Sequence, residues 1–154
     1  MNDAVTDTTE AELTEVTYVR VFDAPRELVF ACMLDPKHLT HFWGPTGMST
    51  PLDKIVVEPW VGGAFKTVMV NDATGEEYAS SGVYTEITEP SRLAWTENET
   101  PTTATTDFID LGDGRTEVRI HQTNIPVMFT TEEAQAGFKT SLDRFAAHLA
   151  TLTG

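Results

Sequence analysis

Cysteine, basic residues and long apolar runs are all scarce in this sequence of 154 residues. The single cysteine, Cys32, excludes an intramolecular disulfide and fits a reducing compartment. No apolar run approaches the ~20 residues that span a bilayer, and the N-terminus has neither the basic nor the apolar region of a secretory signal. We therefore expect a cytoplasmic protein without membrane insertion.

The scarcity of basic residues argues against nucleic-acid binding. Ten Lys and Arg stand against 24 Asp and Glu, which gives a net charge of −14. Phosphate backbones are bound by basic patches, and ten dispersed cations cannot form one against this excess of carboxylates. The acidic surface is typical of a soluble protein, and docking to a basic partner is the alternative reading.

Motifs of common catalytic and cofactor sites are missing as well. The chain has no Gly-x-Ser-x-Gly nucleophile motif, no phosphate-binding loop and no dinucleotide fingerprint. Gly62-Gly63 reads as a turn, because it lacks the lysine and the helix start that a phosphate loop needs. No cofactor is expected.

The length fits one domain, which at this size buries roughly 70% of the surface of its unfolded chain. Residues 1–13 are polar, acidic and rich in threonine, so we expect a flexible tail there. No repeat or linker divides residues 14–154, which we expect to form a single domain.

Hydrophobic patterning predicts one strand, two short helices, six strands and one long helix. The expected strands are residues 16–22, 52–58, 64–70, 77–88, 92–98, 102–111 and 116–124, and the short helices begin near Pro25 and Lys37. In the last strand Val118, Ile120 and Gln122 alternate with Glu117, Arg119 and His121, so the first three are expected to point inward.

The C-terminal helix is the clearest element. Thr130 to Glu133 has the pattern of a capping box, in which Thr130 accepts from the Glu133 amide and the Glu133 side chain reaches back. Phe138, Leu142, Phe145, Leu149 and Leu152 then recur at steps of four and three, which places them on one stripe.

This order of elements predicts an α+β fold. About seven antiparallel strands need their apolar face covered, and only one long amphipathic helix is present. We expect a strongly curved sheet wrapped around that helix, with the two short helices closing one end. A curved sheet and a single helix leave space between them, so an internal cavity is expected.

Seven short motifs in order resemble the SRPBCC superfamily, which includes START domains, the birch-pollen allergen group and polyketide cyclases. Within it, the chain is most similar to homologues of the activator of heat-shock protein 90 ATPase. The motifs are Phe22-Asp-Ala-Pro-Arg-Glu-Leu-Val-Phe30, Asp35-Pro-Lys-His-Leu39, Phe42-Trp-Gly-Pro45, Gly62-Gly-Ala-Phe65, Gly82-Val-Tyr-Thr-Glu-Ile87, Pro90-Ser-Arg-Leu93 and Gly137 to Leu149.

The resemblance implies the helix-grip form of the fold and does not imply one shared activity. Two positions depart from the family's usual pattern. Phe138 stands where a tryptophan is common, and Met33 where a second aromatic residue is common. Both departures are expected to alter the shape of the cavity and to leave the fold unchanged.

Inward-facing side chains of the predicted sheet and helix are expected to line the cavity, with Trp43 near its entrance. Ligand pockets are mostly apolar and carry a few polar anchors, a part that Thr67, Thr106 and Gln122 suit. The expected lining is Trp43, Phe65, Thr67, Met69, Trp95, Thr106, Phe108, Ile120, Phe138, Leu142 and Phe145.

Few side chains are candidates for chemistry. Tyr78, Gln122 and Asp35 are the weak catalytic candidates, and strand packing is the better explanation for Tyr78. Asp35, His38 and His41 stand three residues apart, a spacing that can hold a metal, but no second set of ligands is evident and Asp35 suits a helix cap. We therefore expect no metal site, Cys32 as a small buried apolar side chain, and His121 on the outer face.

Three functions follow from these observations. The first is binding of a small apolar molecule, either a lipid or a polyketide-like or aromatic compound, in the cavity. The second is an enzyme of cyclase or hydrolase type that acts there. The third, implied only by the resemblance, is a co-chaperone that activates the heat-shock protein 90 ATPase. The chain is expected to be a monomer or a homodimer.

Overall fold

The computed structural model describes residues 13–153, which form eight strands, three α-helices and two 3-10 turns. The strands are β1 (Leu13–Phe22), β2 (Met48–Ser49), β3 (Val56–Val57), β4 (Ala64–Asn71), β5 (Glu77–Thr88), β6 (Arg92–Glu97), β7 (Thr103–Gly112) and β8 (Arg115–Pro126). The helices are α2 (Arg26–Met33), α3 (Pro36–Phe42) and α4 (Glu132–Thr153), and the 3-10 turns are η1 (Leu52–Lys54) and η2 (Val127–Phe129).

All strand pairs are antiparallel, and the sheet follows the order β1-β8-β7-β6-β5-β4-β2, with β3 also pairing with β4. Register shifts interrupt the pairing at Thr14/Val16, Tyr84/Glu86 and Asp110/Gly112. Such bulges bend strands and increase their twist, which allows the sheet to curl. The predicted α+β helix-grip fold is confirmed.

The inner face of the sheet is set by alternation along β7 and β8. Thr106 pairs with Ile120 and Phe108 with Val118, and all four side chains are buried. His121 points the other way and forms a hydrogen bond with Glu15, at 2.6 Å between Nε2 and Oε1. The predicted orientation of β8 and the outward position of His121 are therefore confirmed.

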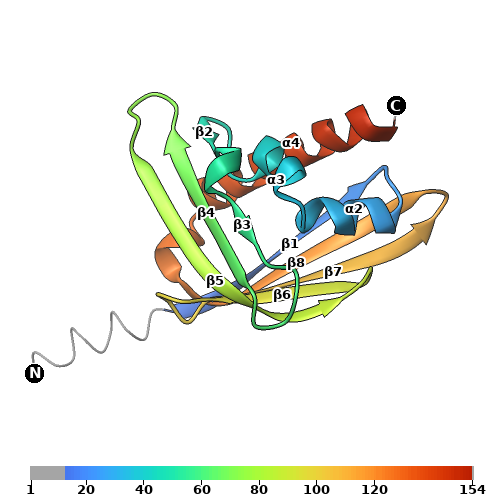
Figure 1. Cartoon of the computed structure of the whole chain (residues 1–154), viewed down its shortest axis with the longest axis horizontal. Coiled ribbons are helices and arrows are strands. Elements are labelled where there is room, and N and C mark those ends of the chain that lie inside the picture. The colour runs from blue at the N-terminus through green and yellow to red at the C-terminus, as the bar shows by residue number, and fades with distance from the viewer. Residues whose placement is uncertain (1–12, 154) are drawn as a thin grey trace, which may run out of the picture.

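Helix α4 covers the inner face of the sheet and runs along its length (Figure 1). Its Phe145 ring stacks on Phe42, with 4.0 Å between ring centroids, and meets Phe22 of β1 at 4.9 Å. About two turns earlier on the same helix, Phe138 stacks on Tyr18, with 4.0 Å between ring centroids. These aromatic contacts join the helix, the first strand and the end of α3 in one core.

Helices α2 and α3 close one end, beside the C-terminal half of α4 (Figure 1). Asp35 caps α3, since its Oδ1 accepts from the Lys37 amide at 2.9 Å, and Pro36 occupies the first turn. The buried Thr116 hydroxyl of β8 donates to the Ala24 carbonyl at 2.7 Å and ties the chain to the sheet just before α2. The predicted cap at Asp35 and the burial of Cys32 are confirmed.

Three local predictions are wrong. The α4 cap is Thr131, whose hydroxyl accepts from the Ala134 amide, while Thr130 donates to the Val127 carbonyl of η2, because that turn continues to Thr130. Residues 52–58 do not form one strand, since Pro51 starts the η1 turn and only Val56–Val57 pair with β4. Leu152 is 42% exposed, because it lies in the last turn of α4 beyond the closed core.

The predicted tail falls almost wholly outside the described residues. Residues 1–12 lie there, and Leu13 already pairs with Pro126 as the first residue of β1. Within residues 13–153, no helix is both long and apolar enough to cross a bilayer.

We expect the substitution Leu149→Ala to lower the free energy of unfolding by about 2–5 kcal/mol, because Leu149 is only 2% exposed and its removal leaves a void in a closed core. Leu152→Ala is the matched control on the same helix and should change stability by less than about 0.5 kcal/mol. Urea unfolding followed by circular dichroism measures both. Similar losses for the two variants would mean that the end of α4 packs differently from this structure.

Candidate functional site: an internal cavity

A cavity of about 180 Å³, partly open to solvent, lies between the sheet and the N-terminal half of α4. Most of its surface is apolar, and its walls come from the end of α3, from strands β4 to β8 and from α4. The side chains of α4 that border it are Phe138, Ser141, Leu142 and Phe145, whereas Leu149 lies beyond its closed end. The cavity therefore occupies the half of the molecule where helix and sheet do not close on each other.

Three aromatic rings form one wall of the cavity. Phe65 of β4 meets Trp95 of β6 edge-on at 5.0 Å and Trp43 edge-on at 5.2 Å, and the two tryptophans lie 5.9 Å apart. Trp43 ends α3, and its carbonyl accepts from the buried Thr50 hydroxyl at 2.6 Å. Edge-to-face packing of this kind gives a rigid surface that suits a flat apolar ligand.

The segment after Trp43 is fastened to α4 by one side chain. Arg144 Nη1 donates to the carbonyls of Gly44, Pro45 and Met48 at 2.7, 3.0 and 3.1 Å. Gly44 has a φ of +101°, and a Cβ there would come within 2.8 Å of the Met69 sulfur. Residues 44–48 thus hold a fixed position at the cavity, beside the tryptophan.

A fully buried hydroxyl in the cavity wall has no partner among the described residues. Thr106 is fully buried, and its hydroxyl has no hydrogen-bond partner among the described residues. Two other hydroxyls in the wall have partners, since Thr102 donates to the Asn124 carbonyl and Ser141 to the Phe42 carbonyl. A buried hydroxyl without a partner costs about 1–3 kcal/mol, and Thr106 bears this cost in the wall of the cavity.

Glu97, at the end of β6, is the one acidic or basic residue among the described residues that line the cavity. Its carboxylate accepts from the Thr100 hydroxyl at 3.1 Å. A carboxylate at the wall repels anions and attracts cations, an effect that strengthens as water is excluded.

Tyr84 contributes a second buried hydroxyl without a partner among the described residues. The ring is 1% exposed and stacks on Phe65 at 5.5 Å, so it lies behind the aromatic wall and does not line the cavity. Burial raises the pKa of this phenol well above its usual value, which keeps it neutral.

The structure places ten of the eleven side chains expected around the cavity in its wall, and Gln122 with them. Phe108 is elsewhere: it packs edge-on against Phe30 of α2 at 5.2 Å, because α2 covers that end of β7. The wall also contains side chains that we did not expect, among them Met33, Phe42, Glu97, Thr102, Ala104 and Val118. Alternation could have identified Thr102 and Ala104, which share the face of Thr106.

The remaining candidates for chemistry lie apart from the cavity. Tyr78 is 48% exposed near the start of β5, where its hydroxyl donates to Glu76 at 3.2 Å, so this catalytic candidate is outside the wall. Asp35 is the cap of α3. His38 is half-buried and His41 exposed, and both rings lie against His148 of α4. Of the three catalytic candidates, Gln122 alone borders the cavity.

Comparison with known proteins supports one family. The family model described as activator of Hsp90 ATPase homolog 1-like protein matches residues 23–150. No curated protein matches the chain.

Many solved structures share the fold. A protein from Chromobacterium violaceum is 28% identical, with a TM-score of 0.79 over 86% of this chain and 95% of that one. An AHSA1-like protein from Aeromonas hydrophila is 19% identical, with a TM-score of 0.76 over 90% of this chain and 93% of that one. An HSP90 activator from Plasmodium falciparum is 23% identical and more distant in structure, with a TM-score of 0.54 over 73% of this chain and 74% of that one.

We expect Leu142→Ala to cost about 1–3 kcal/mol of unfolding free energy, less than truncation of a leucine in a closed core. Leu142 is 6% exposed but already borders the void, so its side chain has fewer packing partners to lose. Urea unfolding beside Leu149→Ala tests this ranking. A loss equal to that of Leu149→Ala would indicate that the cavity is filled by protein atoms.

Proposed function

We propose a function for a chain that belongs to the activator of Hsp90 ATPase homolog 1-like family of the SRPBCC superfamily: it binds a small, apolar, uncharged molecule in its internal cavity. The observation that carries this proposal is the unpartnered Thr106 hydroxyl in the wall of an otherwise apolar cavity. An apolar pocket with few polar anchors is the usual form of a small-molecule site.

The size of the cavity favours a ligand of one or two rings. An engineered apolar cavity of about 150 Å³ holds benzene, so about 180 Å³ accommodates a slightly larger ring compound. A lipid or a polyketide-like chain fits only if part of it extends through the opening.

Charge in the wall favours a neutral ligand. Glu97 disfavours a carboxylate or phosphate on the ligand, and the net charge of −14 adds to this repulsion. The Thr106 hydroxyl can donate to a carbonyl or accept from a ligand hydroxyl. A fatty-acid anion is therefore a poorer fit than a neutral aromatic alcohol or ketone.

An enzyme of cyclase or hydrolase type has less support. General acid–base catalysis needs two groups in reach of the ligand, and of our candidates only Gln122, which does not titrate, borders the cavity. Binding without chemistry is the simpler proposal for this wall.

Activation of the heat-shock protein 90 ATPase rests on the family's name. The Plasmodium activator resembles this chain in fold, which by itself does not transfer a partner. An unchanged ATPase rate of the chaperone at saturating concentrations of this protein would exclude the role. A cytoplasmic location and the absence of a nucleic-acid partner remain predictions from composition.

We expect phenol to bind more tightly than toluene, and benzoate most weakly, because Thr106 offers a hydrogen bond and Glu97 repels the anion. Thr106→Val should weaken the binding of phenol about 2- to 10-fold, the range of one neutral hydrogen bond, and should leave the affinity for toluene unchanged. Titrations followed by nuclear magnetic resonance shifts of residues around the cavity measure these affinities.

Thr105→Val is the matched control, since Thr105 is the next residue of β7 and points to the opposite face. It should leave all three affinities unchanged. Shifts that saturate with none of the three compounds, or that lie away from the cavity, would contradict the proposal. Equal loss of phenol binding in both variants would remove Thr106 as the anchor.

A further inference from the structure

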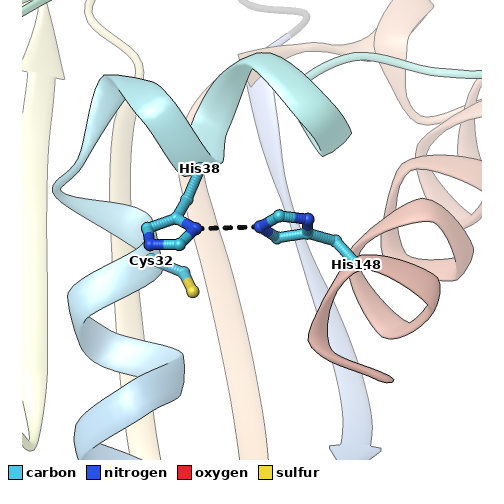
Figure 2. Close-up of side chains that lie close together, drawn as sticks. All are labelled: Cys32, His38 and His148. Carbon is cyan, nitrogen blue, oxygen red and sulfur yellow. Dashed lines mark hydrogen bonds between the residues drawn. The ribbon is translucent and has the colours of Figure 1, made fainter. Parts of the chain in front are cut away.

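Three side chains with metal-binding atoms meet outside the cavity, where α2, α3 and α4 converge. Cys32 lies in α2, His38 in α3 and His148 in α4. Figure 2 shows the rings of His38 and His148 facing each other across the gap between their helices, with the Cys32 sulfur beside that gap. Residues 110 positions apart in sequence are thus brought into direct contact.

The donor atoms are close enough for one ion. His38 Nδ1 and His148 Nε2 are 2.9 Å apart, and one ring nitrogen of each histidine and the Cys32 sulfur all lie within 4.8 Å of one another. With metal–nitrogen bonds of about 2.0 Å and a metal–sulfur bond of about 2.3 Å, tetrahedral coordination places donors roughly 3.3–3.6 Å apart. The nitrogens would separate by about half an ångström and the sulfur would move inward by no more than about 1.5 Å, within the reach of side-chain rotation.

Within residues 13–153, neither imidazole of the cluster has a carboxylate partner. Among the described residues, no carboxylate forms a hydrogen bond with either ring, and the Asp35 carboxylate accepts from the Lys37 amide. Burial, followed by the charges of His41 and His38, lowers the pKa of His148. Burial, with a smaller effect of Asp35, raises the pKa of Cys32 to about 11, which argues against a free nucleophilic thiolate.

We propose that Cys32, His38 and His148 bind one transition-metal ion of borderline softness, with Zn²⁺ as the simplest occupant and solvent as the fourth ligand. One thiolate and two imidazoles are a ligand set that suits Zn²⁺ and copper and does not suit Mg²⁺ or Ca²⁺. On binding, the Cys32 thiol loses its proton to solvent as the metal–sulfur bond forms. The proton shared by the two imidazoles moves to the other nitrogen of its own ring, so one proton is released per ion.

The position of the site indicates a structural role. The ion would link α4 to both short helices at the closed end of the molecule. It would lie behind Phe42 and Phe145, the stacked rings that separate this cluster from the cavity. The proposal is independent of the ligand proposed for the cavity, and either can fail without the other.

Cobalt titration of the full chain tests the site, because Co²⁺ bound to a thiolate absorbs in the near ultraviolet and the chain has a single cysteine. We expect one equivalent of Co²⁺ to give this band and Zn²⁺ to displace it. His148→Gln should weaken Zn²⁺ binding at least tenfold, measured by competition with a chromophoric chelator, since even a lost outer-shell contact costs 10- to 100-fold. Zn²⁺ should also raise the melting temperature of the wild type and leave that of His148→Gln unchanged.

His121→Gln is the matched control, since His121 lies on the outer face of the sheet with Glu15 and is not part of the cluster. This variant should bind Zn²⁺ with the affinity of the wild type. Cys32→Ser should lose the thiolate band, and circular dichroism of the metal-free variants establishes that each is folded. Absence of the band in the wild type would overturn the proposal, as would equal weakening of Zn²⁺ binding in His121→Gln and His148→Gln.

Discussion

The packing of the Phe145 ring against Phe42 and Phe22 is the contact on which the rest of the molecule depends. It joins α4, the end of α3 and the first strand at a single buried ring. Because Phe22 directly precedes the turn into α2, this one contact also sets where the short helices sit. A long helix can cover a curled sheet closely along only part of its length, and the aromatic stack decides that the close part is the C-terminal half.

The cavity follows from that choice. Toward its N-terminus, α4 meets the sheet through Phe138 and Tyr18 on one side only, while the opposite wall is formed by Trp43, Phe65 and Trp95. Arg144 fixes the segment between these walls by binding three backbone carbonyls at once. The void is therefore bounded by rigid aromatic packing and by satisfied backbone groups, so it does not depend on a missing side chain.

The sequence predicts the parts of this arrangement that follow from local period. Alternation in β8 separates Val118 and Ile120 from His121, and the steps of four and three in α4 place Leu142, Phe145 and Leu149 on one face. It does not predict which inward side chain meets which helix, and Phe108 is buried under α2 for that reason. The sequence does not predict the cluster of Cys32, His38 and His148 for the same reason. His38 and His148 are 110 residues apart, and only the fold of the whole sheet brings α4 against α3.

An unfilled cavity has a thermodynamic cost that bears on its purpose. At about 24 cal/mol per Å³, a dry void of this volume would destabilise the fold by roughly 4 kcal/mol, and water entering through the opening lowers that figure. Total stabilities of domains are about 5–15 kcal/mol, so the cost is a substantial fraction of the whole. The fully buried Thr106 hydroxyl without a partner adds to it. Larger apolar side chains in the wall and an apolar residue at position 106 would remove the cost of the void and the cost of the unpartnered hydroxyl. A bound molecule with one polar atom facing Thr106 would remove the same two costs without any change in sequence.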